Sequence, residues 1–239
     1  MQKFISDFIT EFNASFIDKG RWHLYVDGII STFYVTLLAL LIGVLLGVIV
    51  AVIRTAHDQQ RPGKHNPLLA FFNAICHIYI TVIRGTPMMV QLLILGFVVF
   101  SNSREFTLIG TLGLGLNSGA YVAEIVRGGL MSVDSGQVEA SRSLGMTYST
   151  TMFHIVIPQA FKNILPSLGN EFITLFKDTA LISVVGGKEL VYAANSVSSV
   201  TYKVMFPYLG IAAIYLVLVI IFSKLQAKLE RSLRKGDRR

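Results

Sequence analysis

The sequence predicts an all-α integral membrane protein with about five transmembrane helices. Hydrophobic residues make up 53% of the 239 residues and the mean hydropathy is +0.60, which is too apolar for an ordinary soluble domain. Long apolar stretches alternate with short polar ones, as expected of spans of about 20 residues joined by loops. The formal charge of +7 is concentrated at the C-terminal end, which indicates a cytoplasmic tail near anionic lipid rather than nucleic acid binding.

We divide the chain into three regions. Residues 1–25 are expected to be an amphipathic helix in the membrane interface, or a flank without a partner, followed by Trp22 and Tyr25 in an aromatic belt. Residues 26–225 form the transmembrane domain, and residues 226–239 form the basic cytoplasmic tail.

The expected spans follow from the apolar stretches. Residues 26–53 form the first span, where the spacing of Gly43 and Gly47 lets another helix approach closely. Basic residues in a turn-rich loop after it, among them Arg54, Arg61 and Lys64 beside His65, place that loop in the cytoplasm by the positive-inside rule. The later spans are residues 68–100 with a break at Arg84–Pro87, 107–130, 159–185 and 206–225, and residues 186–205 are expected to be an outer loop.

A moderately polar segment at residues 136–158 interrupts the apolar sequence, and we interpret it as a cytoplasmic docking helix. Glu139 lies in its first turn, where a negative charge favours the helix dipole, and Gly145 ends it as a C′ glycine. Ser149 or Thr150 can cap a second helical turn. The pattern predicts a short helix, a tight corner and a return to the membrane.

This segment resembles the loop of ABC-importer permeases that reads E-A-A, three residues, G, nine residues, I-x-L-P. The matching residues are Glu139, Ala140, Gly145, Ile155 and Pro158, while Ser141 and Ile157 are mild departures and Leu144 belongs to the same corner. The motifs R-G-T-P-M-M-V-Q-L at residues 84–92 and S-G-A-Y-V-A-E-I-V-R-G-G-L at residues 118–130 are similar to those of the polar-amino-acid branch. The chain is identified on these blocks as a member of that branch.

The resemblance implies a type I ABC importer permease in the bacterial cytoplasmic membrane. Five spans place the N-terminus outside and the C-terminus in the cytoplasm, in agreement with the basic loop and the basic tail. The resemblance also implies a second permease subunit, identical or related, two copies of an ABC ATPase that grip residues 139–145, and an extracytoplasmic amino-acid-binding protein. The chain lacks a G-x-x-x-x-G-K-[ST] phosphate loop. It would therefore be no enzyme and need no cofactor of its own, because the partner ATPase would use ATP and Mg.

The fourth span carries polar residues every three or four positions, and this spacing places them on one helix face. A charge at the centre of a bilayer costs about 2.5–3.5 kcal/mol, so this face is expected to meet protein, water or ligand. A zwitterionic amino acid needs an acceptor, donors and polar partners, and the face offers all three. The candidate residues are Asn163, Asn170, Glu171, Thr174, Lys177 and Asp178.

The resemblance assigns substrate contact to Glu171, Lys177 and Asp178, whereas an ion network that ties helices together remains the alternative for all three. Arg84 and Tyr121 are further candidates for the pathway, and Glu124 is one helical turn from Arg127, so these two can pair. The sequence leaves glutamine, histidine, arginine, cystine and glutamate open as substrates.

Other classes of protein fit less well. An ion-coupled secondary amino-acid transporter would also hold charges in the membrane, but such folds usually show internal repeats, and the sequence shows none. A receptor or assembly subunit would leave the intramembrane charges without a role. The single cysteine, Cys76, gives neither a disulfide nor a metal-ligand pattern and is expected to serve packing.

Overall fold

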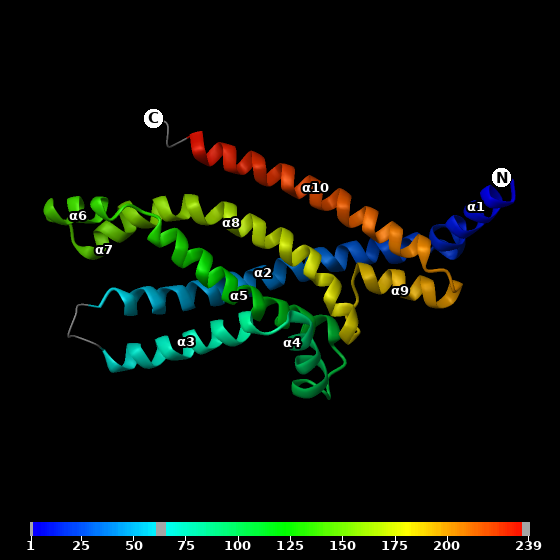
Figure 1. Ribbon diagram of the computed structural model, residues 1–239, viewed down its shortest axis with the longest axis horizontal. Helices are drawn as coiled ribbons and strands as arrows, with labels where there is room; N and C mark the ends of the chain where they lie inside the picture. Colours follow the sequence, from blue (N-terminus) through cyan, green and yellow to red (C-terminus); the bar gives the residue numbers. More distant parts are fainter. Residues whose placement is uncertain (1, 61–65, 236–239) are drawn as a thin grey trace. The chain divides into compact units, whose positions relative to one another are not determined.

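The computed structural model describes residues 2–60 and 66–235, and within these ranges it is helical with no β-strand (Figure 1). The helices are α1 (Gln2–Phe16), α2 (Trp22–Asp58), α3 (Pro67–Gly85), α4 (Met88–Ile94), α5 (Phe106–Met131), α6 (Ser135–Ser143), α7 (Tyr148–Thr151), α8 (Ile157–Asp178), α9 (Leu190–Thr201) and α10 (Met205–Lys235). Short 3-10 and π-helical segments connect some of them: η1 (Asp18–Gly20), η2 (Leu95–Val99), η3 (Met152–Val156) and η4 (Thr179–Val185). The predicted all-α fold is confirmed. Arg61, Lys64 and His65 of the predicted loop and residues 236–239 of the predicted tail lie outside the described residues.

Within the described residues, four helices are long and apolar enough to cross a membrane, namely α2, α3, α5 and α10. Helix α8 has 22 residues, and its polar face keeps its hydropathy low. These five helices agree with the predicted number of spans. The predicted break after Arg84 is also present, because α3 ends at Gly85 and Thr86 is extended, the conformation that a following proline favours.

The chain forms two compact units, and four long helices contribute one part to each. Unit 1 comprises Met1–Ala39, Met88–Leu114 and Ile173–Lys224. Unit 2 comprises Leu40–Pro87, Gly115–Phe172 and Leu225–Arg239. The two units are described separately below.

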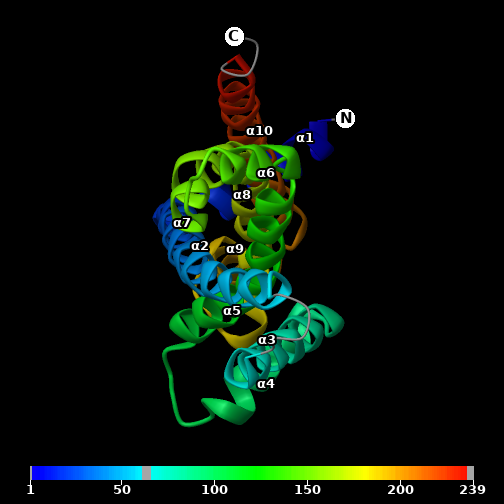
Figure 2. The same ribbon diagram turned by 90° about the vertical axis from the view of Figure 1, so that its left-hand side faces the viewer.

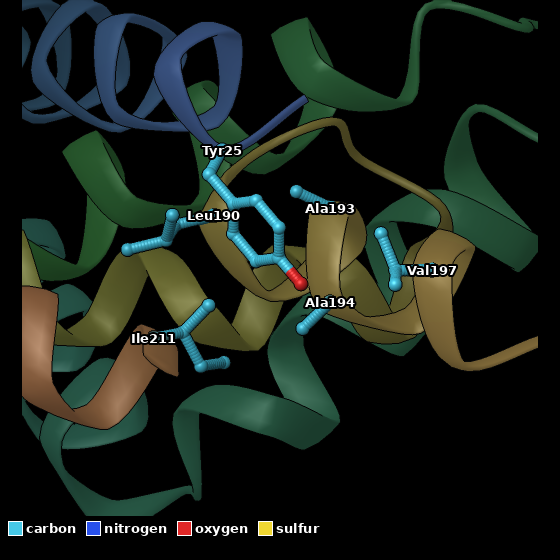
Figure 3. Packing of buried hydrophobic residues seen from close by; sticks show 6 residues of the cluster. All are labelled: Tyr25, Leu190, Ala193, Ala194, Val197 and Ile211. Atoms are coloured by element: carbon cyan, nitrogen blue, oxygen red, sulfur yellow. The ribbon is translucent and has the colours of Figure 1, made fainter. Parts of the chain in front are cut away.

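The core of unit 1 forms around α9, a helix that lies within the expected outer loop. Figure 3 shows its buried cluster, which consists of Tyr25, Leu190, Ala193, Ala194, Val197 and Ile211. The placement of Tyr25 in an aromatic belt was wrong, because its side chain is only 4% exposed and its hydroxyl donates to the Ser15 carbonyl at 3.4 Å. Packing of α9 and α10 against the start of α2 buries the tyrosine, and sequence periodicity alone does not show such packing.

Helix α1 packs against its own unit through a few specific contacts. The rings of Phe8 and Phe206 meet edge to face with centroids 4.8 Å apart, and Lys203 Nζ forms a salt bridge with Glu11 Oε1 at 2.7 Å. Ile5 and Ile9 remain about half exposed on another side of the helix. The N-terminal segment therefore has a packing partner, and its position in the membrane interface stays a prediction.

Unit 2 is built on close helix packing. A Cβ on Gly43 would lie 2.7 Å from Ser118 Oγ, and a Cβ on Gly47 would lie 2.7 Å from the Val122 side chain. The predicted glycine pair thus lets α2 approach α5 of the same chain. Cys76 is buried in a neighbouring apolar cluster, in agreement with the packing role expected for it.

Candidate functional site

The predicted docking helix is α6, and both of its ends are closed by side-chain or backbone hydrogen bonds. At its start, Asp134 Oδ1 accepts from the Gly136 amide at 3.0 Å. At its end, the Gly145 amide donates to Arg142 and the Met146 amide donates to Ser141, at 3.0 and 3.1 Å. This pair of bonds is a Schellman motif, so α6 ends at the predicted glycine.

The corner after α6 depends on Gly145, whose φ is +84°. A side chain at this position would be strained in the left-handed region, although no atom lies within 4 Å of where its Cβ would be. The next turn, α7, is capped by Thr147, whose hydroxyl accepts from the Thr150 amide at 3.2 Å. The expected caps, Ser149 and Thr150, lie inside the turn instead. Figures 1 and 2 show α6 and α7 joined by this corner.

A buried hydrogen bond joins the two helices across the corner. The hydroxyls of Ser141 and Thr151 are 3.0 Å apart, and their residues are only 3% and 0% exposed. Ser141 replaces an alanine of the related motif, and its hydroxyl also donates to the Val138 carbonyl. Sequence reasoning missed Thr151, because nothing local to it indicates a partner ten positions away.

The outer surface of the corner presents an apolar side chain. Leu144 is 85% exposed, and Glu139 and Ala140 are exposed on α6 before it. Ile155 is half-buried in the π-helical turn η3, and Pro158 is exposed at the start of α8. Of the predicted coupling residues, Ser141 therefore stabilises the corner from inside, while Leu144 is available to a partner.

Two contacts tie this region to the end of α2. The Tyr148 hydroxyl donates to Gln59 Oε1, and Arg127 forms a salt bridge with Asp58 at 2.8 Å. The expected pair of Glu124 with Arg127 is not formed, because Asp58 takes the Arg127 guanidinium. None of these partners was predicted, since each contact joins segments far apart in the sequence.

Glu124 pairs instead with Arg84 at the end of α3. The Arg84 guanidinium also lies over the Tyr121 ring, with its central carbon 5.1 Å from the ring centroid. Tyr121 and Glu124 are one turn apart on α5, so a single arginine can reach both. The structure therefore brings together the two predicted pathway residues Arg84 and Tyr121.

The part of the α8 polar face that belongs to unit 2 is held by hydrogen bonds from α5 and the segment after it. Ser118 Oγ donates to Glu171 Oε1 at 2.7 Å, and Asn163 Nδ2 donates to Ser132 Oγ at 2.8 Å. Ser118 is fully buried, and Glu171 is half-buried. The Glu171 carboxylate is thus oriented by a buried donor on a neighbouring helix.

The remaining candidates on α8 differ in exposure. Asn170, Thr174 and Lys177 are exposed, and Asp178 is half-buried at the end of the helix. Residues from Ile173 onward belong to unit 1, so the structure describes the two halves of the polar face separately. Across residues 2–60 and 66–235, no group of three or more His, Cys, Asp or Glu side chains could hold a metal ion.

Apolar helices long enough to cross a membrane, with charged groups on helix faces, are features of a helical membrane transport subunit. The chain belongs to the family described as the binding-protein-dependent transport system inner membrane component, whose model matches residues 68–235. This family membership confirms the resemblance to ABC-importer permeases and supports that class over an ion-coupled secondary transporter.

Known proteins of this class match most of the chain. The Bacillus subtilis (strain 168) protein named "Probable glutamine ABC transporter permease protein GlnM" is 38% identical over 222 residues, which cover 90% of this chain and 96% of that one. The same organism's "Arginine transport system permease protein ArtQ" is 38% identical over 168 residues, or 68% of this chain and 76% of that one. A solved structure titled "Crystal structure of an amino acid ABC transporter with histidines" is 44% identical with a TM-score of 0.78, and covers 87% of this chain and 94% of that one.

Proposed function

We propose that this chain is the permease subunit of an ATP-driven importer for polar or charged amino acids. The observation that carries the proposal is the charged face of α8. On this face the Glu171 carboxylate is oriented by the buried hydroxyl of Ser118, which lies on α5. Charged groups inside a membrane protein are costly and mark a pathway or a ligand site by default. The names of the relatives, which refer to glutamine and arginine, support an amino acid as the ligand.

In this proposal, the charge of each pathway residue determines which part of the substrate it contacts. Glu171 and Asp178 accept the substrate ammonium, whereas Lys177 and Arg84 bind its carboxylate. The uncharged candidates Asn163, Asn170, Thr174 and Tyr121 contact its side chain. The alternative, an ion network that only stabilises the helices, predicts a loss of folding yield before any change in selectivity.

We propose that movements of the ATPase, driven by ATP hydrolysis, are transmitted to the permease at the corner between α6 and α7. Two copies of an ABC ATPase, which use ATP and Mg, grip the exposed Leu144 and the α6 surface around Glu139. The Schellman end of α6 and the Ser141–Thr151 bond make the corner stiff, so a movement of the ATPase is passed on to the membrane helices. A second permease subunit, identical or related, completes the pathway, and an extracytoplasmic amino-acid-binding protein delivers the substrate.

The proposed orientation in the bacterial inner membrane follows from the charges. The basic C-terminal segment and the loop after α2 face the cytoplasm, together with α6 and α7, and the N-terminus lies outside. An odd number of spans is consistent with termini on opposite sides. Residues 1–25, 26–225 and 226–239 then act as the interfacial region, the permease domain and the cytoplasmic tail.

The proposal is tested by uptake into proteoliposomes that hold this subunit with its ATPase. ATP is enclosed, ion gradients are collapsed, and a panel of labelled amino acids is supplied with the binding protein. We expect ATP-dependent uptake of one or a few polar amino acids. Uptake that does not depend on ATP but requires a proton or sodium gradient would overturn the proposal.

A further inference from the structure

A cavity of about 370 Å³ lies in unit 1 beside α9. Its polar walls come from the start of α2, the segment before α9, and α9 itself. These residues are Asp27, Ser31, Lys188, Glu189, Tyr192 and Ser196. The volume is at the small end of the roughly 300–1,000 Å³ that ligand pockets have.

Charges of opposite sign face this cavity. Asp27 and Lys188 are exposed, and within the described part of the chain neither forms a salt bridge. The serine and tyrosine side chains around them add hydroxyl groups that donate and accept hydrogen bonds. A carboxylate and an ammonium around one small space match a ligand that carries both charges.

The cavity walls are fixed by the fold rather than by a ligand. The Lys188 amide donates to Thr107 Oγ1 at 2.9 Å, and its carbonyl accepts from the Ser31 hydroxyl. The Leu190 amide donates to Thr32 Oγ1 at 3.3 Å. Hydrogen bonds from α2 and from the start of α5 therefore hold the backbone around Lys188. The Lys188 side chain begins at a fixed position beside the cavity.

Two further features stabilise the walls. A Cβ on Gly28 would lie 2.9 Å from the Leu190 Cα, so only glycine allows α2 to approach this segment so closely. In the apolar cluster of Figure 3, Leu190 and Ala193 pack on Tyr25, and this packing holds α9 against α2. A preformed site costs a ligand little reorganisation on binding.

We propose that this cavity binds a free α-amino acid as its zwitterion, with Asp27 contacting the ammonium and Lys188 the carboxylate. The ligand class rests on the proposed function, and the site is separate from the α8 face that the proposed function assigns to the pathway. In the proposed orientation the cavity lies toward the outer side. An amino acid released there occupies it before it reaches α8.

Substituted-cysteine protection tests this site without any transport. In a Cys76→Ala background, Ser196→Cys places a thiol in the cavity wall, and Ser199→Cys places a matched thiol one turn further along α9, outside the cavity. Both serines bond to a carbonyl of α9, so the two substitutions disturb the helix similarly. The full-length chain with its ATPase is placed in nanodiscs and treated with a membrane-impermeant methanethiosulfonate, with and without millimolar L-arginine or L-glutamine.

We expect the amino acids to slow modification at position 196 and not at position 199. Agmatine, which lacks the carboxylate, and 5-guanidinopentanoate, which lacks the α-ammonium, should protect poorly. Asp27→Asn and Lys188→Gln should each raise the protecting concentration about tenfold or more, as expected for the loss of one charge-assisted contact. Glu171→Gln should leave protection at position 196 unchanged.

Three results would overturn the proposal. The first is no protection by either amino acid, and the second is equal protection in Asp27→Asn, Lys188→Gln and the parent. The third is protection by the binding protein alone, regardless of amino acid, which would make the cavity a protein-docking surface. Failure of the proposed function gives a different result, because ATP-driven uptake would then be absent while protection at position 196 persists.

Discussion

Arg84 and Glu124 form an ion pair that joins the end of α3 to α5, and the same guanidinium lies over the Tyr121 ring. The pair draws Glu124 away from Arg127, its neighbour on the same helix. Both side chains of the pair are more than a third exposed, at 38% and 42%. Such a pair contributes about 1 kcal/mol or less to stability, so its stabilising effect alone explains little of its presence.

A double substitution separates a structural role of this pair from a role in transport. Arg84→Ala should lower uptake and also leave Glu124 without its partner, which lowers the melting temperature slightly. Arg84→Ala with Glu124→Ala should restore the melting temperature, because no charge is left unpaired. We expect uptake to remain low in the double variant, since the guanidinium that we propose as the partner of the substrate carboxylate is still missing. Recovery of uptake together with stability would show that Arg84 serves the fold only.

The corner at Gly145 gives a prediction about coupling. Gly145→Val forces a β-branched residue to a φ of +84°, which costs a strain of about 1–3 kcal/mol. The corner should relax to another shape, so that ATP hydrolysis continues while the uptake per ATP falls severalfold. The measurement is the ratio of labelled amino acid to phosphate released in proteoliposomes.

Gly128→Val is the matched control for this change. A Cβ at Gly128 would also meet no atom within 4 Å, but its backbone is an ordinary α-helix. The control should keep the parent ratio of uptake to ATP hydrolysed. Equal ratios in the Gly145 variant and the parent would count against the docking assignment.

The buried Ser141–Thr151 bond predicts non-additive changes in stability. Ser141→Ala leaves the Thr151 hydroxyl buried without this partner, which costs about 1–3 kcal/mol. Thr151→Val should cost a similar amount, and the double variant should cost clearly less than the sum of the two. Limited proteolysis of the segment between α6 and α8 measures this, and additive effects would mean that the hydroxyls do not stabilise each other.

Particular residues show how far the sequence could predict this structure. The corner at Gly145 and the break after Arg84 could be predicted, because glycine at C′ and a residue before proline have local conformational preferences. Helix α9 could not, because its serines and asparagine are typical of a loop, whereas its packing against Tyr25 joins segments far apart in the sequence. The partner of Arg127 could not be predicted either, since Glu124 offers suitable spacing and only the fold brings Asp58 closer.

Glu189 gives a prediction about pH. It lies between η4 and α9, outside the membrane-crossing helices, and it is 1% exposed. Its carboxylate accepts from the amides of Val191 and Tyr192 at 2.7 and 2.8 Å and from the Tyr215 hydroxyl at 3.2 Å. Burial raises the pKa of this carboxyl from 4.5 to about 7, although these hydrogen bonds oppose the shift.

The folded protein therefore holds a proton on Glu189 at a pH where the unfolded chain has released it. The free energy of unfolding should fall as the pH rises from 4.5 to about 7, and this contribution is lost above that range. Glu189→Gln cannot ionise, so its melting temperature should depend less on pH over the same interval. A thiol-reactive dye that detects exposure of the buried Cys76 on heating measures both proteins. Identical pH profiles for the two would mean that Glu189 ionises in the folded state as readily as in the unfolded one.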